Sequence, residues 1–178
     1  MELWNIGKYH PRLLAVLIMD KKLLTKEFID QLDQDLSIHD KDQRNNIFTW
    51  LMANQLTKSK KTIDMMLGWR DEKSSNLRRL FWYYQARLRW TGKDHSENSD
   101  ELLDYIEVNI LKSEPEVQWT MNFLMAEIGL YEISRRERCI QMGKKFGLYK
   151  DEKVAKGCTP SYVPEFIRIE AEKMEKGS

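Results

Sequence analysis

The sequence of 178 residues contains few of the residues that bend or cross-link a chain: two cysteines, four prolines and eight glycines. Two cysteines without CxxC spacing cannot build a disulfide framework, and they favour a reducing, cytoplasmic protein. The low glycine and proline content argues against a turn-rich all-β fold. No apolar run approaches the ~20 residues of a membrane span, and the first residues lack the apolar segment of a signal peptide. We expect a soluble protein without a membrane association.

Motifs of the common enzyme classes are also missing. The chain has no glycine-rich phosphate loop, no GxSxG and no HExxH. No spacing of His, Cys, Asp and Glu resembles a metal site, so we expect neither a metal nor a cofactor. The formal net charge is +1, which excludes a polycation. Any contact with nucleic acid must therefore come from local patches of charge.

The apolar residues repeat with a helical period along almost the whole chain, and no segment shows the period of two that a strand requires. Thr25 is predicted to be a helix N-cap, and the next helix is predicted to start at Asp40 or Asp42, of which Asp40 is well suited as the N-cap. Ser99 is predicted to cap a further helix after a polar loop over residues 93–99, and residues 113–116 and 134–137 read as capping boxes. We predict an all-α fold forming a single domain over residues 1–178. A closed bundle and a stack of helix pairs both fit this pattern.

Charge is distributed in blocks. Residues 56–93 hold ten Lys or Arg and three Asp or Glu, residues 94–116 hold eight acids and one Lys, and residues 134–150 hold six bases and one acid. A polyanion would bind a face built from the two basic blocks if the acidic block pointed away. In the alternative arrangement, these blocks are solvated helix faces whose opposite charges compensate one another. The distribution of charge, taken by itself, favours this alternative.

The predicted helix over residues 74–90 carries two stripes. Leu77, Phe81, Tyr84 and Leu88 share one side and form a plausible core face. On another side lie Arg78, Trp82, Gln85 and Arg89. Arginine forks with an aromatic ring between them suit a phosphate backbone and its bases. An equally strong alternative is that Trp82 packs on a neighbouring helix and the arginines pair with acids of residues 94–116.

The predicted helix that follows Pro115 carries Trp119, Phe123 and Glu127 on one face, at positions i, i+4 and i+8. An aromatic stripe of this kind is more often core than a binding surface. A carboxylate one turn beyond two aromatic rings is nevertheless placed where its surroundings would raise its pKa.

Four segments resemble a known family. They are residues 3–15 (LWNIGKYHPRLLA), 116–129 (EVQWTMNFLMAEIG), 136–151 (RERCIQMGKKFGLYKD) and 154–164 (VAKGCTPSYVP). These segments resemble DNA alkylation repair proteins of the AlkD-like superfamily, in a branch that is mostly uncharacterised. The resemblance implies HEAT-like antiparallel helical repeats that form a curved α-solenoid with a basic concave face for duplex DNA. It also implies that this family's N-terminal helices are absent from the chain.

The family excises cationic N3- and N7-alkylated purines with a carboxylate and aromatic side chains. An anion and π faces stabilise the positive charge that develops on the sugar. In the best register of the resemblance, Asp40 matches the catalytic Asp, whereas Leu36 stands where the family has Trp. Phe123 stands at the second aromatic position, and Arg78 or Arg79 at a basic position that contacts DNA.

The leading hypothesis is therefore a HEAT-like protein that binds alkylated duplex DNA and hydrolyses the N-glycosidic bond of alkylpurines, with Asp40 as the catalytic carboxylate. The candidate DNA-binding residues are Arg78, Arg79, Trp82, Arg87, Arg89, Trp119 and Phe123. The alternative is a catalytically inactive helical-repeat module that binds DNA or a protein partner. The sequence does not decide between them.

Overall fold

The computed structural model describes residues 2–92 and 96–177, and all regular structure within these residues is helical. Ten α-helices and five 3₁₀ turns follow one another along the described residues, which confirms the predicted all-α fold. The helices divide into two compact units, Met1–Phe81 and Trp82–Ser178, and the boundary falls inside one helix. The expectation of a single domain over residues 1–178 stays a prediction.

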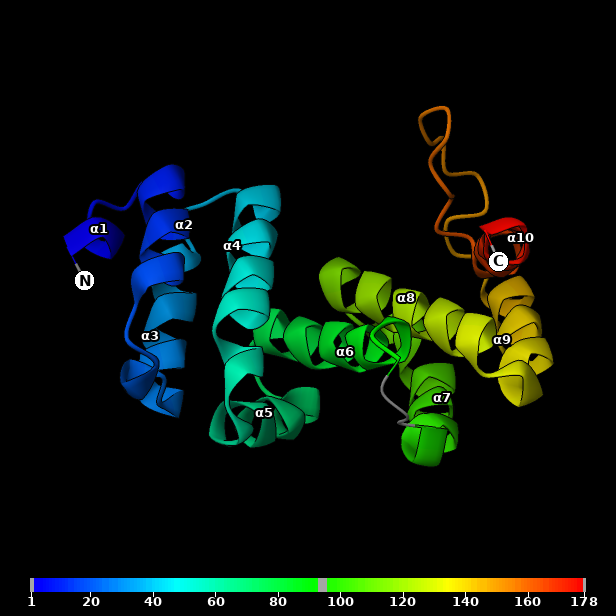
Figure 1. Cartoon of the computed structure of the whole chain (residues 1–178), viewed down its shortest axis with the longest axis horizontal. Coiled ribbons are helices and arrows are strands. Elements are labelled where there is room, and N and C mark those ends of the chain that lie inside the picture. Colours follow the sequence, from blue (N-terminus) through cyan, green and yellow to red (C-terminus); the bar gives the residue numbers. More distant parts are fainter. Residues whose placement is uncertain (1, 93–95, 178) are drawn as a thin grey trace. The chain divides into compact units, whose positions relative to one another are not determined.

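The first unit consists of short helices (Figure 1), and most of its buried side chains are apolar. Its helices are α1 (Glu2–Asn5), α2 (Tyr9–Ile18), α3 (Lys26–Leu36), α4 (Lys41–Asn54), α5 (Lys60–Leu67) and the first residues of α6 (Ser75–Trp90). The 3₁₀ turns Lys21–Leu23, Leu56–Lys58 and Gly68–Asp71 connect them. Helices α2 and α4 pack against each other, and Val16, Phe48 and Leu51 are among the side chains buried there.

Two helix starts in this unit are those that the sequence predicts. The Thr25 hydroxyl accepts a hydrogen bond from the Phe28 amide at 3.3 Å, and the Asp40 carboxylate accepts one from the Gln43 amide at 2.9 Å. Each side chain thereby satisfies one of the amides that a helix start leaves without a partner. Both N-cap predictions are confirmed.

The second unit contains the rest of α6, then α7 (Ser99–Asn109), α8 (Pro115–Tyr131), α9 (Ile133–Phe146) and α10 (Val163–Gly177). The 3₁₀ turns Ser96–Asn98 and Ile110–Lys112 flank α7. Helices α8, α9 and α10 pack on one another, and α7 packs on α8. Residues 93–95 of the predicted polar loop lie outside the described residues. No helix in the described ranges is long and apolar enough to cross a membrane.

Three other predicted caps are wrong, and the hydroxyls of two of them, Ser99 and Ser113, form other hydrogen bonds. Ser99 is the first residue of α7, and its hydroxyl donates to Glu132 at 2.7 Å. The Ser113 hydroxyl donates to the Asn109 carbonyl at 3.0 Å, and α8 begins with Pro115 after Glu114 without a side-chain cap. Helix α9 begins at Ile133, before the predicted cap Ser134. At Ser99 the competing contact is tertiary, and at Ser113 it is local.

Close helix packing at two glycines holds the second unit together. A Cβ atom on Gly129 of α8 would lie 2.9 Å from the Cys139 Cβ atom and would also overlap Ile167. A Cβ atom on Gly143 of α9 would lie 2.9 Å from the side chains of Val163 and Pro164. The glycines thus let α8, α9 and α10 approach closely, and this approach fixes the position of α10 beside the aromatic residues of α8.

Candidate functional site

A group of five aromatic side chains in mutual contact, which we call the aromatic cluster, lies in the second unit. Its members are Tyr83, Trp90, Trp119, Phe123 and Phe166, and all are half-buried. The Phe123 ring stacks on Trp119 with centroids 5.3 Å apart and planes 19° apart. It also stacks on Tyr83 at 5.9 Å and 24°. Half-buried rings of this kind keep part of their surface available for a ligand.

Three helices bring the aromatic cluster together. Trp119 and Phe123 are one turn apart on α8, and Tyr83 and Trp90 are two turns apart on α6. Trp90 packs against Phe123 at 5.6 Å, and Phe166 of α10 meets Phe123 edge-on at 6.1 Å and 88°. Phe123 is therefore the centre of the cluster, and the other four rings are its neighbours.

A small cavity of about 130 Å³ opens beside the aromatic cluster. It is lined by Trp119, Asn122, Phe123, Ala126, Thr159, Ser161 and Phe166. Two walls come from α8 and α10, and the third comes from the irregular segment that precedes α10. The Asn122 side chain holds this segment by donating to the Ser161 carbonyl at 2.8 Å. The cavity therefore combines aromatic faces with hydroxyl and amide groups.

Glu127 lies one helical turn after Phe123 and is buried, with 4% of its surface exposed. Its Oε2 atom has no hydrogen-bond partner among the described residues. Burial, with a smaller contribution from the charge of Glu170, raises the pKa of Glu127 to about 8. The carboxyl is therefore mostly neutral at pH 7, because desolvation penalises the charged form. This confirms the pKa shift that its place beyond two aromatic rings predicts.

Arg87 supplies a positive charge next to the aromatic cluster. Its guanidinium carbon lies 5.9 Å from the centroid of the Trp90 ring, within the range of a cation–π contact. Arg87 is half-buried, and no carboxylate of the described residues forms an ion pair with it. Its fork of N–H donors can therefore meet an anionic ligand beside the rings.

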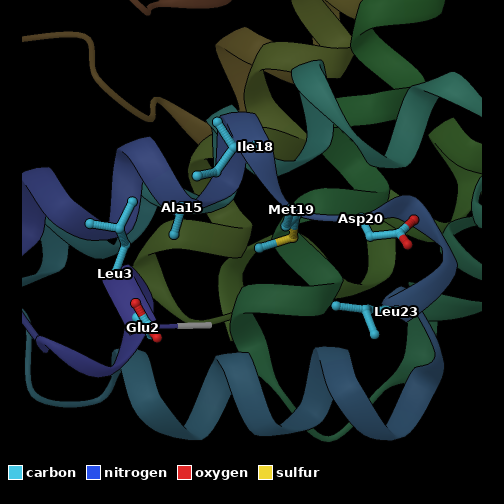
Figure 2. Close-up of a pocket in the computed structure, with 7 residues that line it drawn as sticks. All are labelled: Glu2, Leu3, Ala15, Ile18, Met19, Asp20 and Leu23. Atoms are coloured by element: carbon cyan, nitrogen blue, oxygen red, sulfur yellow. The ribbon is translucent and has the colours of Figure 1, made fainter.

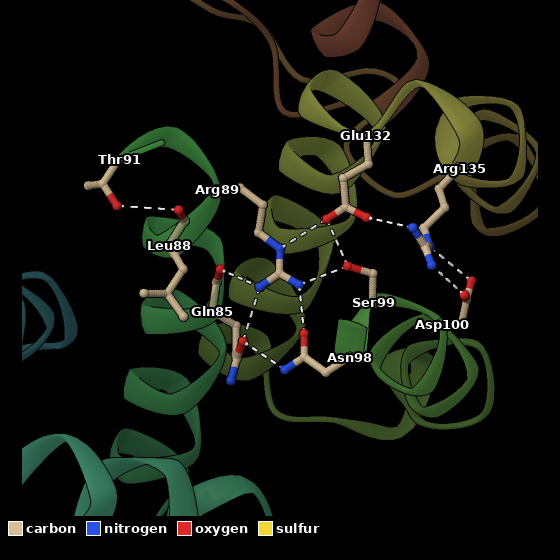
Figure 3. Close-up of polar contacts among 9 residues, drawn as sticks. All are labelled: Gln85, Leu88, Arg89, Thr91, Asn98, Ser99, Asp100, Glu132 and Arg135. Carbon is tan, nitrogen blue, oxygen red and sulfur yellow. Dashed lines mark hydrogen bonds and ion pairs between the residues drawn. The ribbon is translucent and has the colours of Figure 1, made fainter. Parts of the chain in front are cut away.

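Arg89, in contrast, is committed to the interior of the unit (Figure 3). Its side chain is 3% exposed and lies 3.4 Å from the Glu132 carboxylate. It also donates to Gln85 at 3.0 Å, to Asn98 at 2.9 Å and to the Ser99 hydroxyl at 2.9 Å. These contacts tie α6 to the starts of α7 and α9. Among the described residues, Arg89 forms an ion pair with Glu132, which lies outside the acidic block of residues 94–116.

Trp82 also has the position of a core side chain. It is completely buried, and its ring lies 5.3 Å from that of Tyr105 on α7. Of the predicted stripe Arg78, Trp82, Gln85 and Arg89, only Arg78 is half-buried and the other three are buried. For Trp82, this burial matches the alternative in which its ring packs on a neighbouring helix instead of binding DNA. The predicted core stripe Leu77, Phe81, Tyr84 and Leu88 is buried as expected.

The remaining predicted residues lie in the first unit. The Arg78 guanidinium donates to the carbonyl oxygens of Glu72 and Lys73, just before α6. Arg79 is 7% exposed and donates to the Thr49 hydroxyl at 3.2 Å. Asp40 is exposed at the start of α4, whereas Leu36, which stands where the family has Trp, is completely buried.

The acidic and basic blocks of the second unit face each other. Arg135 lies 2.6 Å from Asp100, Arg138 lies 2.5 Å from Asp104, and Lys145 lies 2.7 Å from Glu107. These partners join α7 to α9 along one side. The expectation that the acidic block points away from residues 134–150 is therefore wrong. The charges of the two blocks compensate each other, as in the alternative of solvated helix faces. Because the pairs are exposed, each adds little stability.

A second cavity, of about 500 Å³, lies in the first unit between α1, α2 and the turn Lys21–Leu23 (Figure 2). Its lining consists of Glu2, Leu3, Ala15, Ile18, Met19, Asp20 and Leu23. The two carboxylates in an otherwise apolar wall disfavour a polyanion. No predicted site residue lines it, and no group of three His, Cys, Asp or Glu in the described residues converges on a metal position.

The sequence-based reasoning missed Tyr83, Trp90, Phe166 and Thr159. Tyr83 and Trp90 had a usable signal, since positions i and i+7 lie on the same side of a helix. Phe166 and Thr159 had none, because their place beside Phe123 depends on the close packing of α10 on α8.

A solved structure provides a comparison for the whole chain. It is described as belonging to a new family of proteins related to the HEAT-like repeat DNA glycosylases, with affinity for branched DNA structures. The match covers 99% of this chain and 72% of that chain, with a TM-score of 0.67 and 18% sequence identity. This likeness confirms the predicted HEAT-like helical-repeat fold. No protein-family model matches the chain, and no curated protein matches it significantly.

Proposed function

We propose that this protein is a DNA-binding module that prefers branched DNA to plain duplex. The observation that carries the proposal is the half-buried aromatic cluster with Arg87 beside it. Stacking on aromatic rings holds bases that are not paired, and guanidinium groups hold the adjoining phosphates. The affinity of the fold relative for branched DNA structures supports the same ligand class.

Branched DNA fits this cluster better than intact duplex for a physical reason. Bases inside a duplex are stacked on their neighbours and do not present their faces to protein side chains. At a junction or a fork, some bases lose a stacking neighbour, so their faces are available to rings such as Trp119 and Tyr83. The second unit also neutralises its α9 cations with α7 acids, which leaves less charge for binding along a uniform duplex.

The proposal is tested by fluorescence anisotropy with a labelled four-way junction and a duplex of the same sequence. We expect tighter binding of the junction, with an affinity that decreases as salt increases. Phe123→Ala removes the ring at the centre of the cluster and should weaken junction binding more than duplex binding. Equal affinity for both DNAs, or binding that does not depend on salt, would contradict the proposal.

A second candidate function is hydrolysis of the N-glycosidic bond of N3- or N7-alkylpurines. The observation that favours it is the exposed carboxylate of Asp40 at the start of α4, at the position that resembles the catalytic Asp of the AlkD-like glycosylases. A carboxylate stabilises an oxocarbenium-like transition state. Against it stands Leu36, whose buried side chain offers no π face to an alkylated base. Alkylated duplex DNA is the substrate to test, by measuring released 3-methyladenine and 7-methylguanine.

A further inference from the structure

The cavity beside the aromatic cluster has the size of one six-membered ring. Its volume is about 130 Å³. An apolar cavity of about 150 Å³ holds a benzene molecule, whereas sites for drug-sized ligands measure about 300–1,000 Å³. The cavity is therefore too small for a nucleotide as a whole, and a single-ring base is the part of a nucleotide that matches it.

The walls of the cavity suit a flat heteroaromatic ring. Trp119 and Phe123 are nearly parallel, with 19° between their planes, and Phe166 stands at 88° to Phe123. Asn122, Thr159 and Ser161 add polar groups to the same lining. Pyrimidine bases need both features, because they stack through their faces and form hydrogen bonds through their edges.

The segment that leads into the cavity supplies cations for a DNA strand. Lys150, Lys153 and Lys156 are exposed in the connection between α9 and α10, which also contains the cavity residues Thr159 and Ser161. These lysines form no ion pair with any carboxylate of the described residues. Glu152, in the same connection, accepts a hydrogen bond from the Ser161 amide at 2.8 Å. This bond holds residues 152 and 161 of the connection together. The lysines therefore add positive charge to the same connection that forms one wall of the cavity, and positive charge favours a DNA strand.

We propose that this cavity holds one unpaired pyrimidine base of the bound DNA, stacked against Trp119. This inference rests on the proposed DNA-binding function and adds the kind of base and its position. The base must be unpaired, because a base inside a duplex cannot reach a pocket in the protein. Branch points and gaps provide such bases without the energetic cost of unpairing.

The test uses the full chain and a branched DNA that has one unpaired thymidine, with an otherwise identical DNA that has an abasic residue at that position. We expect the protein to bind the thymidine DNA about tenfold more tightly, the effect of stacking one base on an aromatic ring. Ala126→Leu fills the cavity and should reduce this ratio to about one. Val108→Leu, which adds apolar volume at an exposed position of α7 outside the cavity, is the control and should retain the ratio. Both variants should bind the abasic DNA as the unaltered protein does.

A second pair of variants keeps the test independent of how well Ala126→Leu folds. Trp119→Ala should bind the thymidine DNA and the abasic DNA about equally. Trp119→Phe should retain most of the preference for the thymidine DNA, since an aromatic ring face remains. If the unaltered protein bound the two DNAs equally well, the proposal that the cavity holds a base would be wrong. The proposed DNA-binding function would still stand. No binding of either DNA would overturn the proposed function itself. An unpaired adenine that gains as much affinity as thymine would overturn the preference for a single-ring base.

Discussion

The guanidinium of Arg89 lies 3.4 Å from the carboxylate of Glu132, and both side chains are largely withdrawn from solvent, at 3% and 11% exposure (Figure 3). Arg89 is on α6, and Glu132 lies at the start of α9. Burial lowers the pKa of Arg89, and the Glu132 charge opposes that shift. Glu132 also pairs with Arg135 at 3.2 Å. Removing one partner of a buried ion pair is costly, because the remaining charge keeps its desolvation penalty and loses the attraction of that partner.

Removing one member of this pair should destabilise the second unit. We expect Glu132→Ala to lower the free energy of unfolding by about 3–5 kcal/mol, the cost of breaking a buried ion pair by removing one partner. Urea unfolding followed by circular dichroism measures this loss. Arg87→Ala, at a half-buried position of the same helix as Arg89, should cost less than about 1 kcal/mol. A loss below about 1 kcal/mol for Glu132→Ala would show that the pair is not a structural requirement.

Arg87 should act on DNA affinity, in contrast to Arg89. We expect Arg87→Gln to weaken junction binding and to reduce the slope of log affinity against log salt by about one, the effect of losing one phosphate contact. Anisotropy titrations at several salt concentrations measure the slope. Arg168→Gln, which removes a guanidinium paired with Glu172 on α10, is the matched control and should leave the slope unchanged. An unchanged slope in Arg87→Gln would exclude a phosphate contact by this residue.

Glu127 should make stability depend on pH. Its pKa is about 8 in the folded protein, against 4.5 for an ordinary glutamate. The unfolded chain releases this proton at lower pH, so the contribution of the neutral carboxyl is complete below about pH 4.5 and is lost as pH rises to about 8. Glu127→Gln keeps a neutral side chain at every pH. As pH rises across this window, the free energy of unfolding of the variant minus that of the unaltered protein should therefore increase by up to a few kcal/mol. Denaturant unfolding at about pH 5, 6.5, 8 and 9 provides the comparison, and a constant difference across these pH values would refute the assignment.

The close approach at Gly129 should be sensitive to a single methyl group. We expect Gly129→Ala to cost about 1–3 kcal/mol, because its Cβ atom would lie 2.9 Å from the Cys139 Cβ atom and would overlap Ile167. Gly68→Ala is the control, since a Cβ atom added there would have no neighbour within 4 Å and the φ of Gly68 is −79°. Thermal unfolding of both variants measures the difference. Equal melting temperatures would mean that α10 moves away without cost.

Asp40→Asn provides a clean test of the glycosylase candidate. Asn is as good an N-cap as Asp, so the variant should keep its helix start while it loses the negative charge. If the protein is a glycosylase with Asp40 as its stabilising carboxylate, release of 3-methyladenine and 7-methylguanine from methylated duplex should fall by several orders of magnitude. Retained release by Asp40→Asn would exclude this role, and no release by the folded, unaltered protein would leave the DNA-binding proposal alone.

Periodicity was sufficient to predict most of the fold. The core stripe Leu77, Phe81, Tyr84 and Leu88 is buried as its spacing predicts, and Thr25 and Asp40 cap helices as their side chains predict. These features depend on local backbone geometry, in which a helix places every third or fourth residue on one side. Sequence alone could also place Glu127 beyond two aromatic rings and so anticipate its raised pKa.

Only the tertiary structure decided which polar and aromatic residues meet. Arg87 and Arg89 are both candidate DNA-binding residues in the sequence, yet Arg89 is enclosed by Glu132, Asn98 and Ser99, whereas Arg87 lies at the aromatic cluster. Phe166 joins Phe123 because Gly129 lets α10 pack closely on α8. The physical reason is that helical period specifies the side of a helix, whereas the partner of that side depends on how distant segments pack.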